Sequence, residues 1–170
     1  MDNSAKVRRT LKLCLGCLRG AAYYRAGQKQ KDKWIDDDFC RHNNTNSIDM
    51  SVIDWCKVFG DPKAKHYWKK SVKNPDELYS SILTAANVTE SEFEQYIGEM
   101  REYRDKFLAH LDEANLMHIP HLDIAISTSI SIYNHLAQGG SDLENIVPND
   151  AQKFYDSRLK YAEKKYEDAT

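Results

Sequence analysis

The sequence predicts an all-α fold: a single helical bundle of five to seven helices, with residues 1–170 forming one domain. Three observations lead to this prediction. The chain has only seven glycines and four prolines, too few for the many turns of a sandwich or barrel of short strands. Apolar residues recur at spacings of three and four, which is typical of amphipathic helices. With 41% hydrophobic and 29% charged residues, a chain of 170 residues has enough apolar side chains for one core.

The first predicted helix is basic and covers residues 5–27. Its apolar face has helical spacing: Leu11, Cys14, Leu15, Leu18 and Ala22. On this face Cys14 and Cys17 lie one turn apart, and we interpret them as reduced thiols. The alternative is a metal knuckle in which Cys40 and His42 supply the other two ligands. The second pair has Cys-x-His spacing and no turn glycine, which disfavours that alternative.

A second helix is expected from Trp34 to Arg41, followed by a polar loop over residues 42–47. Helical spacing resumes from Ile48 to Phe59 and stops at Gly60-Asp61-Pro62. The lysine-rich segment 63–72 has only weak periodicity and is expected to be a turn of helix or a loop.

Start signals mark the remaining helices. Asn74-Pro-Asp-Glu77 predicts a capped helix that ends at Asn87, and Thr89-Glu-Ser-Glu92 is a capping box. The following helix carries the most regular apolar stripe of the chain: Phe93, Tyr96, Ile97, Met100, Arg104, Phe107, Leu108 and Leu111. Another helix runs from Leu122 to Leu136 and is closed by Gly139-Gly140. A capping box at residues 141–144 leads to a charged helix over residues 150–168.

The net charge of −2 conceals an uneven distribution along the chain. Residues 1–33 carry nine basic and two acidic side chains, and residues 63–73 carry five lysines and no acid. Residues 74–147 have a net charge of −10. The two basic segments suit a polyanion, although solvated helix faces would show the same pattern.

No apolar run reaches the ~18 to 20 residues of a membrane span. Near the start, Lys12 and Arg19 leave an apolar stretch too short for a signal peptide. We therefore expect a cytoplasmic protein that does not insert into a membrane.

Arg104 breaks the apolar stripe of its helix, and His110 follows six residues later. A charge on a buried face is costly unless it is paired or partly solvated, so Arg104 needs an explanation. One explanation is structural, a salt bridge to Asp105, Glu99 or a neighbouring helix.

The other explanation comes from a resemblance. The stretch Tyr103-Arg-Asp-Lys-Phe-Leu-Ala-His-Leu-Asp112 resembles the signature of HEPN domains, in which an arginine and a polar residue precede a histidine at this spacing. The form of the motif is especially similar to the abortive-infection branch. The resemblance is sharp over these ten residues and looser, as a helix pattern, over residues 48–137.

The resemblance implies a helical bundle that dimerises through the motif helices. It also implies a metal-independent endoribonuclease without a cofactor, acting as a toxin in phage defence or paired with an antitoxin protein. Arg104 and His110 would be the catalytic pair, and Asp105 would orient them. Other members of the superfamily are inactive and bind RNA, a nucleotide or a protein partner.

These residue types suit RNA cleavage, because the 2′-hydroxyl of RNA is itself the nucleophile. A histidine moves its proton near neutral pH, and an arginine stabilises the charge that develops on the phosphate. On an ideal helix, however, six residues place two side chains ~9 Å apart along the axis and ~120° apart around it. Either the helix is distorted before His110, or two copies of the chain complete the site across a two-fold axis.

Two further groups of residues are candidates for binding. The lysine-rich segment predicts an RNA-binding patch of Lys63, Lys65, His66, Lys69 and Lys70. Its aromatic neighbours Tyr67 and Trp68 suit base stacking, although packing against the core is the more usual role. His118 and His121, with His110 or Asp123, are a weaker alternative for a metal site. We predict that the protein holds no metal.

Overall fold

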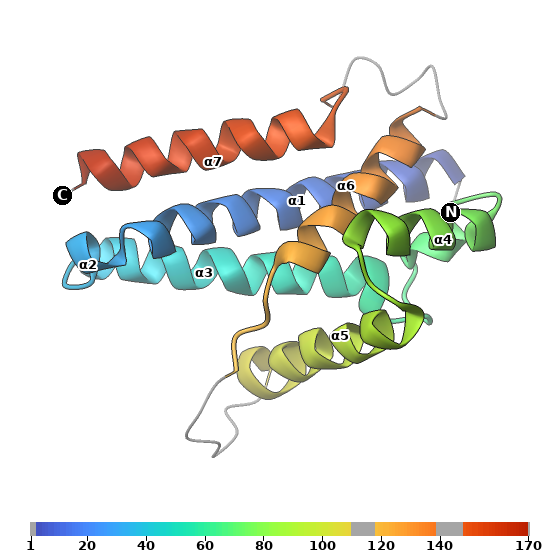
Figure 1. Cartoon of the computed structure of the whole chain (residues 1–170), viewed down its shortest axis with the longest axis horizontal. Helices are drawn as coiled ribbons and strands as arrows, with labels where there is room; N and C mark the ends of the chain where they lie inside the picture. The colour runs from blue at the N-terminus through green and yellow to red at the C-terminus, as the bar shows by residue number, and fades with distance from the viewer. Residues whose placement is uncertain (1–2, 110–117, 139–147, 170) are drawn as a thin grey trace.

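The computed structural model describes residues 3–109, 118–138 and 148–169. All regular elements in this part are helical, which confirms the predicted all-α bundle (Figure 1). The α-helices are α1 (Asn3–Lys29), α2 (Lys31–Trp34), α3 (Asp38–Trp55), α4 (Pro75–Ala86), α5 (Glu90–Glu102), α6 (Asp123–Ala137) and α7 (Ala151–Asp168). Three short helical segments have another geometry: the π-helical η1 (Cys56–Gly60) and η3 (Tyr103–Ala109), and the 3₁₀ turn η2 (Trp68–Lys70).

Helix α1 is the centre of the bundle. It lies between α3 and α7, and α6 crosses it (Figure 1). Its buried face consists of small and medium-sized residues: Leu11, Cys14, Cys17, Leu18, Ala21, Ala22 and Ala26. The predicted stripe of the first helix is therefore confirmed in its buried positions, and the small side chains allow the neighbouring helices to come close.

The predicted loop over residues 42–47 is wrong, because α3 runs through these residues without a break. The predicted helix from Trp34 to Arg41 is also wrong, because α2 ends at Trp34 and α3 begins only at Asp38. Polar side chains of α3 form hydrogen bonds to α1 inside the bundle. The amide of Asn44 is buried and donates to the carbonyl oxygen of Tyr24 at 2.9 Å, and Ser51 donates to the carbonyl oxygen of Cys17 at 2.9 Å.

Glycines in α1 make these polar contacts possible. A Cβ atom added to Gly20 would lie 2.5 Å from the carbonyl oxygen of Ser47, and one added to Gly27 would collide with the amide nitrogen of Asn44. The two helices therefore approach closely where α1 has no side chain in the way. Asn44 and Ser51 of α3 then reach the backbone of α1. Polar side chains of this kind made the helical segment look like a loop in the sequence.

Most helix ends follow the sequence signals. Thr89 and Glu92 form the capping box at the start of α5, and α4 is capped at its C-terminal end by Asn87, whose φ of 54° is left-handed. Asp150 caps α7 by accepting from the backbone N–H of Lys153. The predicted side-chain cap of Asn74 is wrong, because Asn74 makes no capping hydrogen bond and Pro75 alone marks the helix start. The predicted signals at residues 139–144 lie outside the described residues.

An aromatic cluster joins α3, η1 and α5 to the rest of the core. Trp55 stacks on Phe59 with ring centroids 4.9 Å apart and meets Tyr96 edge-on at 5.2 Å. Its indole N–H donates to Thr128 of α6 at 3.0 Å. Trp68 is also buried, which confirms that this aromatic residue of the lysine-rich segment packs in the core. Trp68 lies 6.4 Å from Phe59 between ring centroids, so this cluster joins the end of α3 and η1 to the middle of the lysine-rich segment.

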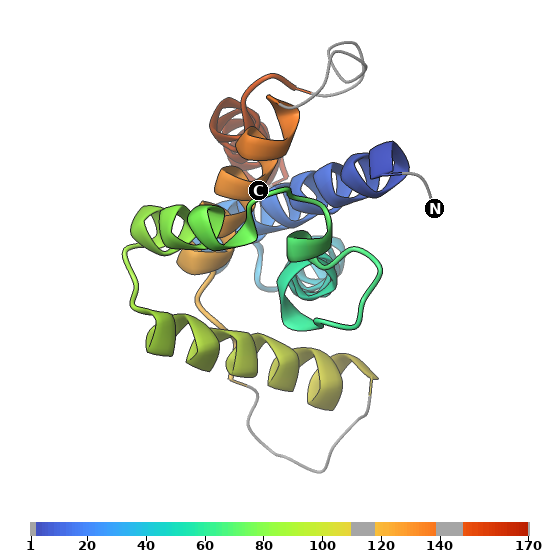
Figure 2. The ribbon, with the colours of Figure 1, turned by 90° about the vertical axis from the view of Figure 1, so that its right-hand side faces the viewer.

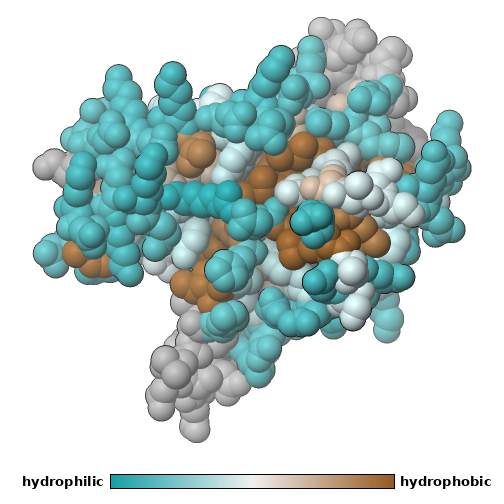
Figure 3. All heavy atoms as spheres, in the orientation of Figure 1, coloured by the Kyte–Doolittle hydropathy of each residue, from teal (hydrophilic) through white to brown (hydrophobic). Residues whose placement is uncertain are grey.

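Figure 3 shows hydrophobic side chains gathered over α4 and α6 on one face of the molecule, surrounded by hydrophilic ones. Half-buried residues of these helices, including Leu83, Ile124 and Ile130, pack against the core. The apolar area on this face is thus the edge of the core. Among the described helices, none has an apolar stretch long enough to cross a membrane.

Candidate functional site

The motif arginine lies where α5 gives way to η3. The helix changes from α to π geometry at Tyr103, one residue before Arg104. Such π-helical turns cost regular hydrogen bonding and occur frequently at functional sites. The helix is therefore distorted before His110, which is one of the two arrangements that the spacing of the motif allows, the other being a site completed by a second copy of the chain. His110 itself lies outside the described residues.

Tyr103, and not Arg104, continues the buried stripe after Met100. Tyr103 is 1% exposed, and its hydroxyl donates to Oδ1 of Asp49 on α3 at 2.7 Å. The prediction that Arg104 lies on the buried stripe is therefore wrong, and its side chain is 28% exposed at the margin of the core. A charge in this position keeps part of its hydration, so its presence is less costly than the sequence suggested.

Arg104 and Asp105 form a two-pronged ion pair. Nε of Arg104 donates to Oδ1 of Asp105 at 2.7 Å, and Nη2 donates to Oδ2 at 3.0 Å. The hydrogen bonds to Asp105 raise the pKa of Arg104, so the guanidinium remains charged. This arrangement brings together two of the three predicted catalytic residues. It is also the salt bridge to Asp105 that the structural explanation of Arg104 expected.

The segment η1 lies directly beside the motif. The thiol of Cys56 donates to the carbonyl oxygen of Met100 at 3.5 Å, and Arg104 and Arg101 are both within electrostatic reach of Cys56. Burial raises the pKa of Cys56 to about 12, so this thiol stays neutral despite the two arginines. Asp61, the first residue after η1, is within electrostatic reach of Arg104. The loop that follows η1 therefore begins next to the motif arginine.

This loop carries the lysine-rich segment to the N-terminal end of α1. Figure 2 shows the segment that contains η1 and η2 between that end of α1 and α5. A buried hydrogen bond of 3.1 Å joins Thr10 of α1 to Ser71, just after η2. The two basic segments, which are far apart in the sequence, are thus neighbours in the fold.

His66 marks the point where the basic segments meet. Burial and the charges of Arg9, Lys65 and Lys57 lower the pKa of His66, so the imidazole is neutral near pH 7. Its Nδ1 atom is buried and has no hydrogen-bond partner in the described part of the chain. Cations from α1, η1 and the loop therefore surround a neutral imidazole. We call Arg9, Lys57, Lys65 and His66 the basic cluster.

The predicted RNA-binding lysines differ in their surroundings. Lys63 and Lys65 are exposed. Lys69 places its ammonium 4.9 Å from the ring centre of Tyr79, and Lys70 donates to the carbonyl oxygen of Ala64 at 3.0 Å. Lys69 is half-buried, and Lys70 is exposed like Lys63 and Lys65, although its ammonium group is engaged by the backbone of the segment. Lys63 and Lys65 are therefore the exposed lysines that make no such contact within the segment.

Arg9 and Lys57 were missed as site residues. Arg9 was counted only within the N-terminal charge excess, and Lys57 lies on the exposed face of an otherwise apolar helical pattern. Their placement near His66 depends on how α1 and η1 meet, and no local sequence signal reports this. Acidic groups also belong to this region: Asp54 pairs with Lys57 at 3.1 Å, and Asp61 lies near Arg104.

The alternative metal sites do not form among the residues that are described, where no group of three or more His, Cys, Asp or Glu side chains could hold an ion. Cys14 and Cys17 lie in the main core, whereas Cys40 belongs to a separate small cluster. His42 is exposed and forms a hydrogen bond with Asn46. All four cysteines are free thiols.

The sequence and the structure were compared with known proteins, and no protein family, curated protein or solved structure matches this chain. The case for a function therefore rests on the residues of the site.

Proposed function

We propose that this chain is a metal-independent endoribonuclease of the HEPN type, acting as a toxin in phage defence or in a toxin–antitoxin pair. The observation that carries the proposal is the proximity of the motif to the basic cluster. Arg104 lies beside η1, and η1 connects it to Lys57 and to the loop with Lys65 and His66. An RNA strand held by the cations Arg9, Lys57 and Lys65 would pass close to the motif.

The roles of the motif residues follow from their chemistry. Arg104 would stabilise the charge that develops on the phosphate, and His110 would move the proton of the 2′-hydroxyl. Asp105 accepts from two donor atoms on one edge of the guanidinium, Nε at 2.7 Å and Nη2 at 3.0 Å, and so fixes the orientation of Arg104. A fixed guanidinium loses little freedom when it binds a phosphate.

We also propose that two copies of the chain complete the site. The HEPN resemblance implies pairing through the motif helices, which would bring two Arg104 and two His110 side chains to one cleft. Sedimentation velocity tests this part: the expected result is a dimer at micromolar concentration. A monomer over the whole concentration range would rule out a site shared between copies.

A second candidate function is binding of RNA without cleavage. The ion pair between Arg104 and Asp105 favours this alternative, because a guanidinium that is already paired has fewer donors left for a reacting phosphate. Both functions use the basic cluster, and only cleavage requires His110.

Expression in a bacterial host separates the two candidates. An active ribonuclease should arrest growth, and His110→Ala should relieve the arrest at equal protein levels. Ser131→Ala, a change at a half-buried residue of α6 away from the motif, is the matched control and should leave the arrest unchanged. If wild type and His110→Ala are equally harmless and neither cleaves RNA, the endoribonuclease proposal is wrong and RNA binding alone remains.

A further inference from the structure

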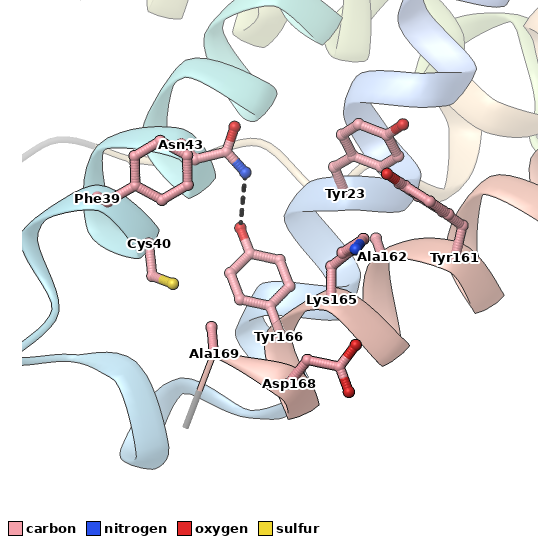
Figure 4. A pocket seen from close by; sticks show the side chains of 10 residues that line it. All are labelled: Tyr23, Phe39, Cys40, Asn43, Tyr161, Ala162, Lys165, Tyr166, Asp168 and Ala169. Atoms are coloured by element: carbon pink, nitrogen blue, oxygen red, sulfur yellow. Dashed lines mark hydrogen bonds between the residues drawn. The ribbon is translucent and has the colours of Figure 1, made fainter.

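A cavity of about 460 Å³ lies between the beginning of α3 and the end of α7, over α1 (Figure 4). This end of the molecule is opposite the N-terminal end of α1 that carries the basic cluster (Figure 1). The volume is within the range of sites for small molecules, ~300 to 1,000 Å³, and such sites often lie between the helices of a bundle. The cavity uses none of the residues of the proposed ribonuclease site.

Four of the ten residues that line the cavity are aromatic: Tyr23, Phe39, Tyr161 and Tyr166. Phe39 of α3 is 77% exposed and Tyr161 of α7 is 50% exposed. They are two of the four large hydrophobic residues that are exposed in the described part of the chain. Exposed aromatic side chains gathered at a hollow indicate binding, because leaving them in water is unfavourable. Phe39 comes from α3 and Tyr161 from α7, on two sides of the cavity, and the ring of Tyr161 also contacts that of Tyr23 with centroids 6.3 Å apart (Figure 4). Exposed aromatic surface of this kind suits a flat ligand.

Asn43 supplies hydrogen bonding at this wall. Its Nδ2 atom donates to the hydroxyl of the buried Tyr166 at 3.3 Å, which fixes the orientation of the amide (Figure 4). The carbonyl oxygen Oδ1 has no partner within the described residues, and the second N–H of Nδ2 is also available. A side-chain amide with a free acceptor and a free donor matches the edge of a nucleobase.

The charged residues at the cavity are of opposite sign. Lys165 lies 5.8 Å from the ring centre of Tyr161, and Asp168 is the other charged lining residue. With one cation and one anion, the lining itself carries no net charge. Affinity for a ligand therefore has to come from the aromatic faces and from the amide of Asn43.

We propose that this cavity binds a planar nitrogen heterocycle of the nucleobase class, stacked against Phe39 and Tyr161 and hydrogen-bonded along one edge by Asn43. The ligand is either a free nucleoside or an unstacked base of a single RNA strand. The chemistry of recognition is the same in both cases, because it involves the base and not the phosphate.

Titration of the full chain with adenosine and with a short single-stranded oligoadenylate tests the proposal. We expect saturable binding that is weakened about tenfold or more by Phe39→Ala and by Tyr161→Ala, which is the typical effect of removing one stacked ring. Asn43→Ala should weaken binding as well. Both aromatic residues are exposed, so truncating them should leave the fold intact, and circular dichroism checks this.

Met50→Ala is the matched control, because Met50 is 51% exposed on the same helix as Phe39 and does not line the cavity. If Phe39→Ala weakens the binding of adenosine, the natural ligand is a free nucleoside. If only the oligonucleotide binds, and Phe39→Ala weakens that binding, the ligand is an unstacked base of an RNA strand. Arg104→Ala should bind adenosine as well as wild type does, so the outcome is independent of the proposed ribonuclease function. Absence of saturable binding to either probe, or equal binding by wild type, Phe39→Ala and Tyr161→Ala, would overturn the proposal.

Discussion

The hydroxyl group of Tyr103 donates a 2.7 Å hydrogen bond to Oδ1 of Asp49, which ties the first residue of η3 to the middle of α3. Arg104 is the next residue along the chain, so this bond helps to fix the backbone from which the guanidinium extends. The ring of Tyr103 is itself buried in the core. The position of the motif arginine is therefore set by α3 as well as by its own helix.

Loss of this hydrogen bond should destabilise the protein. Tyr103→Phe removes the donor and leaves the half-buried carboxyl group of Asp49 without it, which should lower the free energy of unfolding by about 1 to 3 kcal/mol. Asp49→Asn is the matched variant, because its amide oxygen still accepts from Tyr103. Urea unfolding of both variants measures the difference, and equal stability of Tyr103→Phe and wild type would show that the bond contributes nothing.

The same pair predicts a pH dependence. Burial raises the pKa of Asp49, although the hydrogen bond from Tyr103 lowers it, so the folded protein keeps this proton to a higher pH than the unfolded chain does. The contribution of Asp49 to stability is therefore largest below its unfolded pKa of ~3.9 and is lost as the pH rises through the folded pKa. Asp49→Asn should remove this loss, so its stability relative to wild type should increase from about pH 4 to pH 7. A difference that stays constant over this range would contradict the assignment.

Arg104→Ala should change stability little. The ion pair is partly exposed, with side-chain exposures of 28% for Arg104 and 52% for Asp105, and pairs of this kind contribute about 1 kcal/mol or less. A fully buried pair would instead cost ~3 kcal/mol or more when broken. Urea unfolding measures the change. A decrease above ~3 kcal/mol would mean that Arg104 has a structural role.

Removal of cations from the basic cluster should weaken RNA binding in a salt-dependent way. For Arg9→Ala with Lys57→Ala, we expect lower affinity for single-stranded RNA and a shallower dependence of the affinity on salt, by ~0.7 in slope for each phosphate that is no longer neutralised. Lys164→Ala, an exposed lysine near the far end of α7, is the control and should change neither quantity. Filter binding at several salt concentrations measures both. An unchanged slope in the double variant would place the RNA elsewhere.

Two glycines provide a test of the contact between α1 and α3. In Gly20→Ala the new methyl group would meet the carbonyl oxygen of Ser47, so the helices must separate, at a cost of ~1 to 3 kcal/mol or more. Gly98→Ala is the control, because Gly98 lies in α5 with open space around its Cβ position and should gain up to ~1 kcal/mol. Thermal unfolding compares the two variants. If the Gly20→Ala variant were as stable as wild type, the close approach of α1 and α3 would not be needed for stability.

The sequence predicted the helices wherever apolar periodicity and capping signals agreed. Thr89 with Glu92 is the example, since the pair satisfies backbone groups within its own helix. The cap of α7 by Asp150 was not among the predicted signals. The segment 42–47 could not be predicted in this way, because the amide of Asn44 bonds to the backbone of the neighbouring helix α1, whereas the hydroxyl of Ser47 bonds within α3 itself. Local patterns carry no information about which partner a polar side chain meets.

The candidate site was predictable only in part, for a similar reason. Arg104 and Asp105 are adjacent in the sequence, and their pairing was among the interpretations considered. The burial of Tyr103 in place of Arg104 depends on the π-helical turn, which no periodicity rule for an α-helix anticipates. The meeting of Arg9 and Lys57 around His66 depends on tertiary packing between segments almost 50 residues apart.

The most direct test of the central claim is cleavage of a mixed RNA pool by the purified protein in the presence of EDTA. The account predicts that wild type cleaves RNA under these conditions, and that Arg104→Ala and His110→Ala each lose this activity while remaining folded. Intact RNA with wild type, or equal cleavage by wild type and both variants, would contradict it.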